Sequence, residues 1–248
     1  MRRKPARTPR LYVDGPLRAG ARIVLPERAA HHAAAVLRLR EGERVIVFDG
    51  RGGEHDARIA SVARARVEAE VGERRDVERE SPLEIALVQG ISSAERMDLT
   101  VQKAVELGVA AIQPVLAERS LVKLDARRAE ARAEHWRRIV VAACEQSGRN
   151  RVPEVRGVLS LAEYCRTPPG GTRLMLSPGS GTSLRAVVAR LESPVVLAAG
   201  PEAGFSAEEE AMLAGAGFEA VRLGPRVLRT ETAALAALAA LNALAGDY

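Results

Sequence analysis

From Leu83 to the C-terminal end, short apolar runs alternate with helical patterns. The first run, LEIALVQ at residues 83–89, is followed by a helical pattern. This alternation predicts a mostly parallel sheet covered by helices, because a parallel neighbour is reached only through a crossover connection. The predicted fold class is therefore α/β. Two helices are expected to begin at capping boxes, Ser92 with Glu95 and Ser160 with Glu163. Two helices are expected to end at glycines, Gly108 and Gly148.

The first third of the chain has a different pattern. Residues 44–50 and 57–71 alternate polar and apolar side chains, as half-buried strands do, and residues 27–40 form a short helix-like stretch. Several short strands with one helix indicate a small β-barrel or sandwich. Ser81-Pro82 is the expected hinge, so the predicted domains are residues 1–80 and residues 81–248.

The charge of the chain is unevenly distributed. Residues 1–80 carry 18 Lys+Arg and 13 Asp+Glu, whereas residues 81–248 carry 19 of each. The whole net charge of +5 therefore lies in the first third. This asymmetry favours a polyanion-facing domain joined to a neutral one, with a solvated basic tail as the alternative.

Segment lengths and cysteine spacing exclude several protein classes. The longest apolar run, AALAALAALNALA, is shorter than the roughly 20 residues that a membrane-spanning helix needs. The charged start MRRKPARTPR is not followed by the apolar stretch of a secretory signal. Cys144 and Cys165 have neither metal nor redox spacing. We expect a soluble cytoplasmic protein that binds neither a metal nor a membrane.

Three predicted strands end in similar loops. LSPGSGTS (176–183), AGPEAGFS (199–206) and LGPRVLRT (223–230) each place a small residue and then Pro near the strand end. The carboxyl ends of parallel strands share one edge, where ligands bind, so we expect a site there; simple chain turning is the alternative. The dinucleotide and P-loop signatures are absent, and GSGTS remains a weak indication of a phosphate ligand.

Several segments together resemble a known family. They are QKAVELGV (102–109), ERS (118–120), EQSGRNRVPEV (145–155), GPEAGFS (200–206) and LGPRVLRTETA (223–233). Over nearly its whole length the chain resembles the bacterial 16S rRNA uridine N3-methyltransferases (the ribosomal RNA small subunit methyltransferase E family) of the SPOUT class. The resemblance implies a PUA-like RNA-binding β-barrel at residues 1–80 and a SPOUT methyltransferase domain with a trefoil knot at 81–248. It also implies S-adenosylmethionine as cofactor, 16S rRNA or the assembled small subunit as substrate, and a homodimer.

Two positions depart from the family pattern. Ala203 stands where a glycine is usual, so the loop has to adopt a backbone that alanine tolerates or lose about 1 kcal/mol. Ser93-Ala94 replaces a common Lys-Gly pair, which removes one cation.

The resemblance also implies the site residues. The cofactor cleft would comprise Leu176, Gly200, Pro201, Glu202, Gly204, Leu223, Gly224, Val227, Leu228 and Thr230. Glu202 is the expected carboxylate beside the sulfonium, and Thr230 the expected N-cap of the last helix. Arg226 and Arg229 are the candidate catalytic residues, because cations would favour negative charge on the uracil carbonyl oxygens. The general base is left open, although Glu231 is close in sequence.

RNA contacts are expected from seven basic residues: Arg10, Arg38, Arg40, Arg96, Lys103, Arg119 and Arg149. Two rival functions remain, a ribose 2′-O-methyltransferase of the same class acting on rRNA or tRNA and a non-catalytic RNA-binding assembly protein. The Ala-rich C-terminal helix, with its small side chains, is the expected dimer interface.

Overall fold

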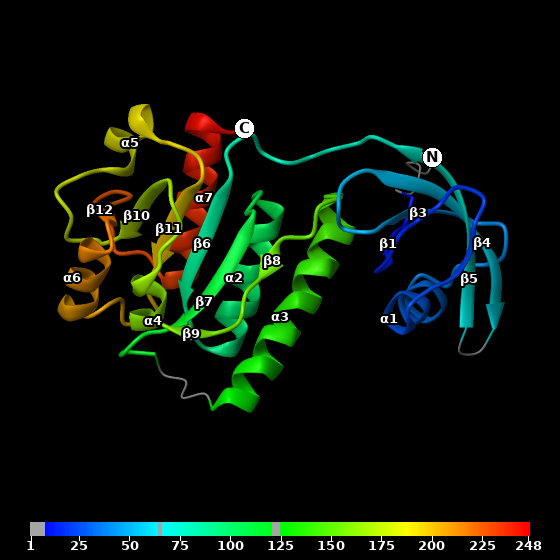
Figure 1. The fold of residues 1–248 in the computed structure, drawn as a ribbon, viewed down its shortest axis with the longest axis horizontal. Helices are drawn as coiled ribbons and strands as arrows, with labels where there is room; N and C mark the ends of the chain where they lie inside the picture. Colours follow the sequence, from blue (N-terminus) through cyan, green and yellow to red (C-terminus); the bar gives the residue numbers. More distant parts are fainter. Residues whose placement is uncertain (1–7, 64–65, 121–124) are drawn as a thin grey trace, which may run out of the picture. The chain divides into compact units, whose positions relative to one another are not determined.

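The computed structural model describes residues 8–63, 66–120 and 125–248 (Figure 1). Internal contacts divide the chain into two units. The first comprises Met1–Glu80 and Cys144–Val152, and the second comprises Ser81–Ala143 and Pro153–Tyr248. The division expected from sequence did not assign the return segment Cys144–Val152 to the first unit.

The first unit is built on a five-stranded sheet. Its strands, in the spatial order β1-β3-β4-β5-β2, are β1 (Arg10–Tyr12), β3 (Arg44–Phe48), β4 (Glu54–Ala63), β5 (Arg66–Arg75) and β2 (Arg22–Val24). Helix α1 (Glu27–His31) continues into the π-helical turn η1 (His32–Val36). Alternate strand residues such as Val45, Val47 and Ile59 are buried with Ala29 and Ala33 in one apolar core. The predicted β-rich first part is confirmed.

The return segment Cys144–Val152 is tied into this unit. Val152 donates its amide to the carbonyl of Gly50 (3.1 Å), and Arg51 forms an antiparallel bridge with Arg151. Cys144 is completely buried, and burial raises the pKa of its thiol to about 12. Cys144 is therefore a packing residue.

Two of the arginines predicted to bind RNA are buried in the first unit. The guanidinium of Arg10 donates to Glu54 and Asn150, and that of Arg149 donates to Glu80. Only 3% of the Arg10 side chain and 5% of the Arg149 side chain are exposed. Buried guanidiniums with these partners cannot reach a phosphate, so we correct the prediction that Arg10 and Arg149 contact RNA.

The second unit contains a seven-stranded sheet in which all paired strands are parallel. The order is β12-β10-β11-β6-β7-β8, with β9 also paired to β7. The bounds are β6 (Ile85–Gly90), β7 (Ala111–Leu116), β8 (Glu154–Val155), β9 (Leu159–Ser160), β10 (Thr172–Leu176), β11 (Val195–Ala199) and β12 (Glu219–Val221). The predicted parallel α/β fold is confirmed. The trefoil knot implied by the resemblance stays a prediction, because strand order does not define threading.

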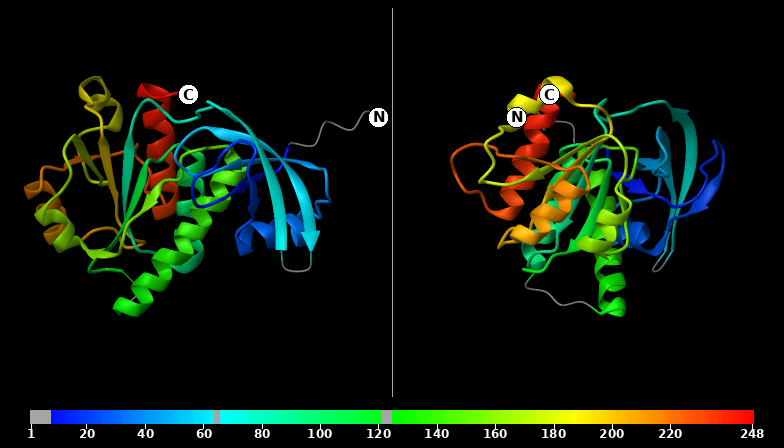
Figure 2. Two further views of the ribbon diagram at one scale, coloured as in Figure 1. Left: turned by 45° about the vertical axis from the view of Figure 1, so that its right-hand side comes forward. Right: turned by 60° about the vertical axis from the view of Figure 1, so that its left-hand side comes forward.

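Helices cover both faces of this sheet (Figures 1 and 2). Helices α2 (Ala94–Glu106) and α7 (Thr230–Ala245) pack together, and α7 contacts β6 and β11. On the opposite face, α4 (Leu161–Arg166) packs against α6 (Ala207–Gly215). The remaining helical segments are α3 (Ala126–Ser147), α5 (Leu184–Val187) and η2 (Val188–Arg190). Burial on both faces explains why the central strand β11, with the sequence VVLAA, is a continuous apolar run.

One of the two predicted capping boxes is wrong. The box at Ser160 forms and begins α4. Helix α2, however, has Ser93 as its N-cap, without a side-chain cap bond. The Ser93 amide instead donates to the carboxylate of Glu202, from a loop distant in sequence (2.8 Å). A tertiary contact therefore replaces the local cap that the sequence predicted at Ser92.

Candidate active site

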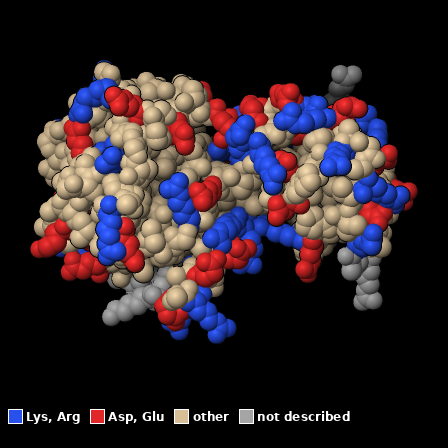
Figure 3. Space-filling view, in the orientation of Figure 1, with Lys and Arg blue, Asp and Glu red and all other residues tan. Residues whose placement is uncertain are grey.

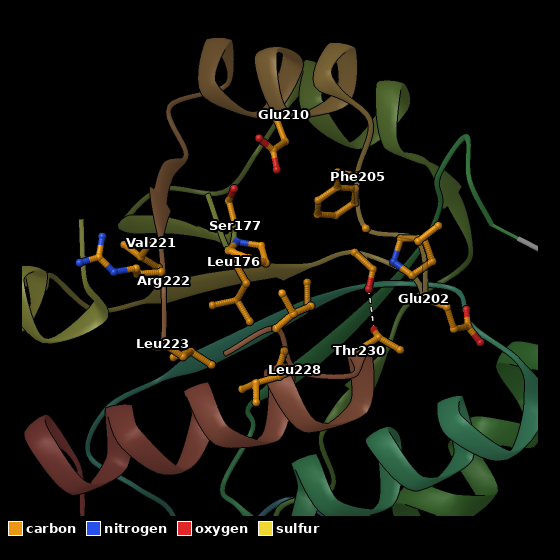
Figure 4. Close-up of a pocket in the computed structure, with 18 of the residues that line it drawn as sticks. Leu176, Ser177, Glu202, Phe205, Glu210, Val221, Arg222, Leu223, Leu228 and Thr230 are labelled. Atoms are coloured by element: carbon orange, nitrogen blue, oxygen red, sulfur yellow. Dashed lines mark hydrogen bonds between the residues drawn. The ribbon is translucent and has the colours of Figure 1, made fainter. Parts of the chain in front are cut away.

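The three loops predicted to follow strands, at residues 176–183, 199–206 and 223–230, meet at one cavity of about 280 Å³ (Figure 4). We call them the first, second and third strand exits. All ten residues predicted for the cofactor cleft line it: Leu176, Gly200, Pro201, Glu202, Gly204, Leu223, Gly224, Val227, Leu228 and Thr230. The loops after β10, β11 and β12 converge because these strands are neighbours and point the same way. The sheet topology thus places three loops that are far apart in sequence around one space.

The cavity also has lining residues that sequence reasoning missed. Ser177, Phe205, Glu210 and Arg222 are among them. Arg222 donates to the carbonyls of Ser180 and Gly181, both at 2.7 Å. Through these bonds Arg222 joins the GSGTS loop to the end of β12. The sequence signal that could have indicated Glu210 is its place in the first turn of the helix after the second exit.

The loop after β11 is fixed by a buried amide. Gln89 is fully buried at the end of β6, and its amide donates to the carbonyl of Gly200 (3.3 Å) and to the hydroxyl of Thr230 (3.1 Å). Thr230 in turn donates to the same Gly200 carbonyl at 2.6 Å. The N-cap of α7 is Arg229, so the prediction that Thr230 is the N-cap is wrong. Its hydroxyl holds the loop after β11 instead.

Two glycines of this region meet different steric demands. A Cβ on Gly200 would lie 2.8 Å from the amide nitrogen of Phe205, so no larger residue fits without moving the loop. Gly204 has φ +71°, a left-handed conformation that favours glycine. Ala203 is not among the residues with positive φ. The departure at Ala203 therefore causes no backbone strain.

Glu202 lines the cavity and is also bound by other groups of the protein, so its expected place beside the sulfonium stays a prediction. Its carboxylate accepts the Ser93 amide (2.8 Å) and the Arg96 guanidinium (3.1 Å). Figure 4 shows its side chain directed away from the other lining residues. Burial opposes ionisation, but the hydrogen bonds from Ser93 and Arg96 outweigh it and lower the pKa of Glu202. One oxygen of this carboxylate thus joins the loop after β11 to the start of α2.

A Glu202→Gln variant should show this charge as a pH-dependent stability difference. Because the pKa of Glu202 is lowered by folding, its contribution is present at neutral pH and is lost as pH falls through the folded-state pKa. We expect the variant to be about 1–2 kcal/mol less stable than wild type at pH 7. The difference should shrink below about pH 4, near the pKa of an ordinary glutamate.

Urea unfolding followed by tryptophan fluorescence measures this difference. Trp136 is the single tryptophan and is buried in the second unit, which also contains Glu202. The matched control is Glu208→Gln, because Glu208 is exposed in the first turn of α6. A Glu202→Gln penalty that is equal at both pH values would contradict the assignment.

The two candidate catalytic arginines differ in position. Arg226 is exposed and lines the cavity, whereas Arg229 is exposed at the N-cap of α7 and is not a lining residue. Glu231, in the first turn of α7, lies 3.9 Å from the guanidinium of Arg96. The structure therefore brings Arg226, but not Arg229, into the cavity wall.

The other predicted RNA contacts fall into two groups. Arg38 and Arg40 in the first unit and Arg119 in the second are exposed. Lys103 pairs with Glu106 at 2.8 Å, and Arg96 is paired as described above. Exposed arginines are available to a phosphate, whereas Arg96 and Lys103 would first have to leave a carboxylate.

Figure 3 shows that basic and acidic side chains are interspersed over the visible face of the molecule. Within the described residues, no group of three or more His, Cys, Asp or Glu side chains could bind a metal ion. In the same part of the chain, none of the helices has the length and apolarity needed to cross a bilayer.

Family models match both parts of the chain. An RNA methyltransferase domain matches residues 79–242, which is more than half of the chain and includes every lining residue of the cavity. An RNA methyltransferase PUA domain matches residues 25–72, in the first unit.

Relatives and solved structures agree with these matches. The ribosomal RNA small subunit methyltransferase E of Mycobacterium bovis is 35% identical, over 96% of this chain and 92% of that protein. That of Bacillus subtilis is 33% identical, over 86% of each chain. The crystal structure of the Neisseria gonorrhoeae enzyme, bound to S-adenosyl methionine, is 43% identical with a TM-score of 0.91, covering 98% of this chain and all of that one.

A Legionella pneumophila methyltransferase, solved with its bound cofactor SAM, is 40% identical with a TM-score of 0.94, again over 98% of this chain and all of that one. The family predicted from sequence is confirmed. The chain therefore belongs to the RNA methyltransferase family, and within it to the ribosomal RNA small subunit methyltransferase E family.

Proposed function

We propose that this protein transfers a methyl group from S-adenosylmethionine to N3 of a uridine in small-subunit rRNA, in the cytoplasm. The observation that carries the proposal is the convergence of three loops on one cavity lined by all ten residues expected to bind the cofactor. Solved relatives at 40% and 43% identity hold S-adenosylmethionine, which supports this donor.

The residues of the cavity fit such a donor. Leu176, Leu223 and Leu228 offer apolar side chains to a flat adenine ring. Polar atoms of the main chain at the strand ends can pair with the ring nitrogens. When bound, the donor supplies an activated methyl group on a sulfonium. The protein then has to position the uridine N3 against that methyl group.

Arg226 has the position to assist this reaction. As N3 loses its proton, negative charge spreads onto the flanking uracil carbonyl oxygens. A guanidinium at the cavity wall favours that charge, as the donors of an oxyanion hole do. Arg229 precedes Thr230, which is anchored to the cofactor loop, and we propose that it contacts the RNA nearby.

We also propose that the enzyme is a homodimer. A second cavity of about 370 Å³, lined by Leu184, Pro225, Ala240 and Leu244 among others, adjoins the candidate cleft on the α7 side. Leu244, in α7, is 49% exposed, and Val227, in the loop that precedes α7, is 82% exposed. A second copy would cover this apolar surface, and sedimentation of the purified chain tests the oligomeric state.

Methylation of small-subunit rRNA, free and in assembled subunits, tests the proposed reaction. Nucleosides released from the treated RNA are separated by mass spectrometry, and we expect N3-methyluridine. A 2′-O-methyl nucleoside would identify the rival ribose methyltransferase. Absence of any methylated nucleoside, together with absence of S-adenosylmethionine binding by calorimetry, would favour the non-catalytic assembly protein.

A further inference from the structure

Glu210 places a carboxylate in the cavity wall. It lies in the first turn of α6, after the second strand exit. Figure 4 shows its side chain directed into the cavity. Within the described chain, its carboxylate forms neither a hydrogen bond nor an ion pair. A charged group in this position is available to a ligand.

The neighbouring glutamates are used by the protein itself. Glu209 accepts the amides of Ser206 (2.9 Å) and Glu118 (2.7 Å), which caps α6 and holds the loop after β7. Glu202 is bound to Ser93 and Arg96, as described above. Among the acidic residues that line the cavity, Glu210 alone has no internal partner within the described part of the chain.

The wall around Glu210 is divided into a polar and an apolar part. The side chain of Ser177 points toward Glu210 from the end of β10 (Figure 4). Leu223 and Leu228 lie across the cavity, on the side of α7 (Figure 4). One corner thus offers a carboxylate and a hydroxyl, while Leu223 and Leu228 make an apolar part of the opposite wall. A ligand that fits has a flat apolar part and, beside it, hydrogen-bond donors.

We propose that Glu210 is a specificity-determining residue that accepts the ribose hydroxyl groups of the methyl donor. An ionised carboxylate has two acceptor oxygens and no donor, and the two vicinal hydroxyls of a ribose present two donors. Acidic side chains bind ribose hydroxyls in the same way in other nucleotide sites. The adenine then lies against the leucines. This inference rests on the proposed placement of S-adenosylmethionine in the cavity.

Calorimetry with the Glu210→Gln variant tests the assignment. Glutamine keeps the shape but replaces one acceptor oxygen by a donor and removes the charge. The probes are S-adenosylhomocysteine, 5′-methylthioadenosine, which lacks the amino-acid part, and the 2′,3′-dideoxy form of 5′-methylthioadenosine. We expect the variant to bind the first two about tenfold more weakly than wild type, a typical loss for a hydrogen bond to a charged group. The dideoxy probe should bind wild type and variant equally.

Glu208→Gln is the matched control, because Glu208 is exposed on the same helical turn and does not line the cavity. Its affinities should equal those of wild type, and equal melting temperatures show that both variants are folded. Unchanged affinity in Glu210→Gln would overturn the inference. So would a loss confined to S-adenosylhomocysteine, since the carboxylate would then bind the amino-acid part.

The proposed cleft has a separate test. If wild type fails to bind S-adenosylhomocysteine, or if Gly200→Ala, which displaces the backbone of the loop after β11, leaves that binding intact, the placement of the donor is wrong whatever Glu210 does. If those two experiments succeed and Glu210→Gln behaves as wild type, only the role of Glu210 fails.

Discussion

Replacing Arg226 by alanine is expected to reduce the single-turnover methylation rate by about 100- to 1,000-fold. This is the usual loss when one fixed donor to a developing negative charge is removed. Arg226 is exposed at the cavity wall and supports no other residue through a side-chain hydrogen bond or ion pair in the described chain. The variant should therefore keep its fold and its affinity for S-adenosylmethionine. Rapid-quench assays with saturating donor and RNA measure the chemical step.

Two further variants show whether the loss of rate is specific to an arginine in the cavity wall. Arg166→Ala removes an exposed arginine of α4 outside the cavity and should leave the rate unchanged. Arg229→Ala should weaken RNA binding more than it slows the chemical step, because Arg229 is not part of the cavity wall. A wild-type rate in Arg226→Ala would remove this residue from the mechanism.

The second large effect is expected for Gly200→Ala. The added Cβ would lie 2.8 Å from the amide nitrogen of Phe205 and 2.9 Å from the carbonyl carbon of Gly204, so the backbone of the loop has to shift. Overpacking of this kind costs about 1–3 kcal/mol. Because the displaced loop forms the cavity wall, we expect S-adenosylmethionine to bind about 10- to 100-fold more weakly in calorimetry.

Gly179→Ala is the control for this substitution. Gly179 lies in the loop after β10, and an added Cβ would meet nothing within 4 Å. Its affinity for S-adenosylmethionine should match that of wild type. Equal affinities in both variants would show that the loop after β11 does not hold the donor.

Sequence patterns were sufficient to predict most of the second unit. Strand β11 is a continuous apolar run and β6 begins with one, because both faces of the sheet are covered at its centre. Apolar runs and the periodicity of the intervening helices are local properties of the sequence. The α/β class and the three strand exits could therefore be predicted from it. The ten cleft residues followed from their resemblance to a family, and the parallel sheet then explains why they meet.

Long-range contacts explain the predictions that failed. Ser92 with Glu95 has the spacing of a capping box, yet Glu202, more than 100 residues away, receives the amide at the start of α2. Thr230 has the chemistry of an N-cap, yet its hydroxyl is bound to Gly200. A sequence window around either residue does not contain the partner that decides its role.

The sequence by itself determined which residue types were available and where the strands end, because periodicity, glycines and prolines act through the local backbone. Only the tertiary structure decided which charges are free. Folding buries Arg10 and Arg149 against carboxylates, turns Glu202 toward Arg96 and leaves Glu210 facing the cavity. The physical reason is that a charged side chain pairs with whichever group the fold brings within about 4 Å, and that proximity is set by the packing of distant segments.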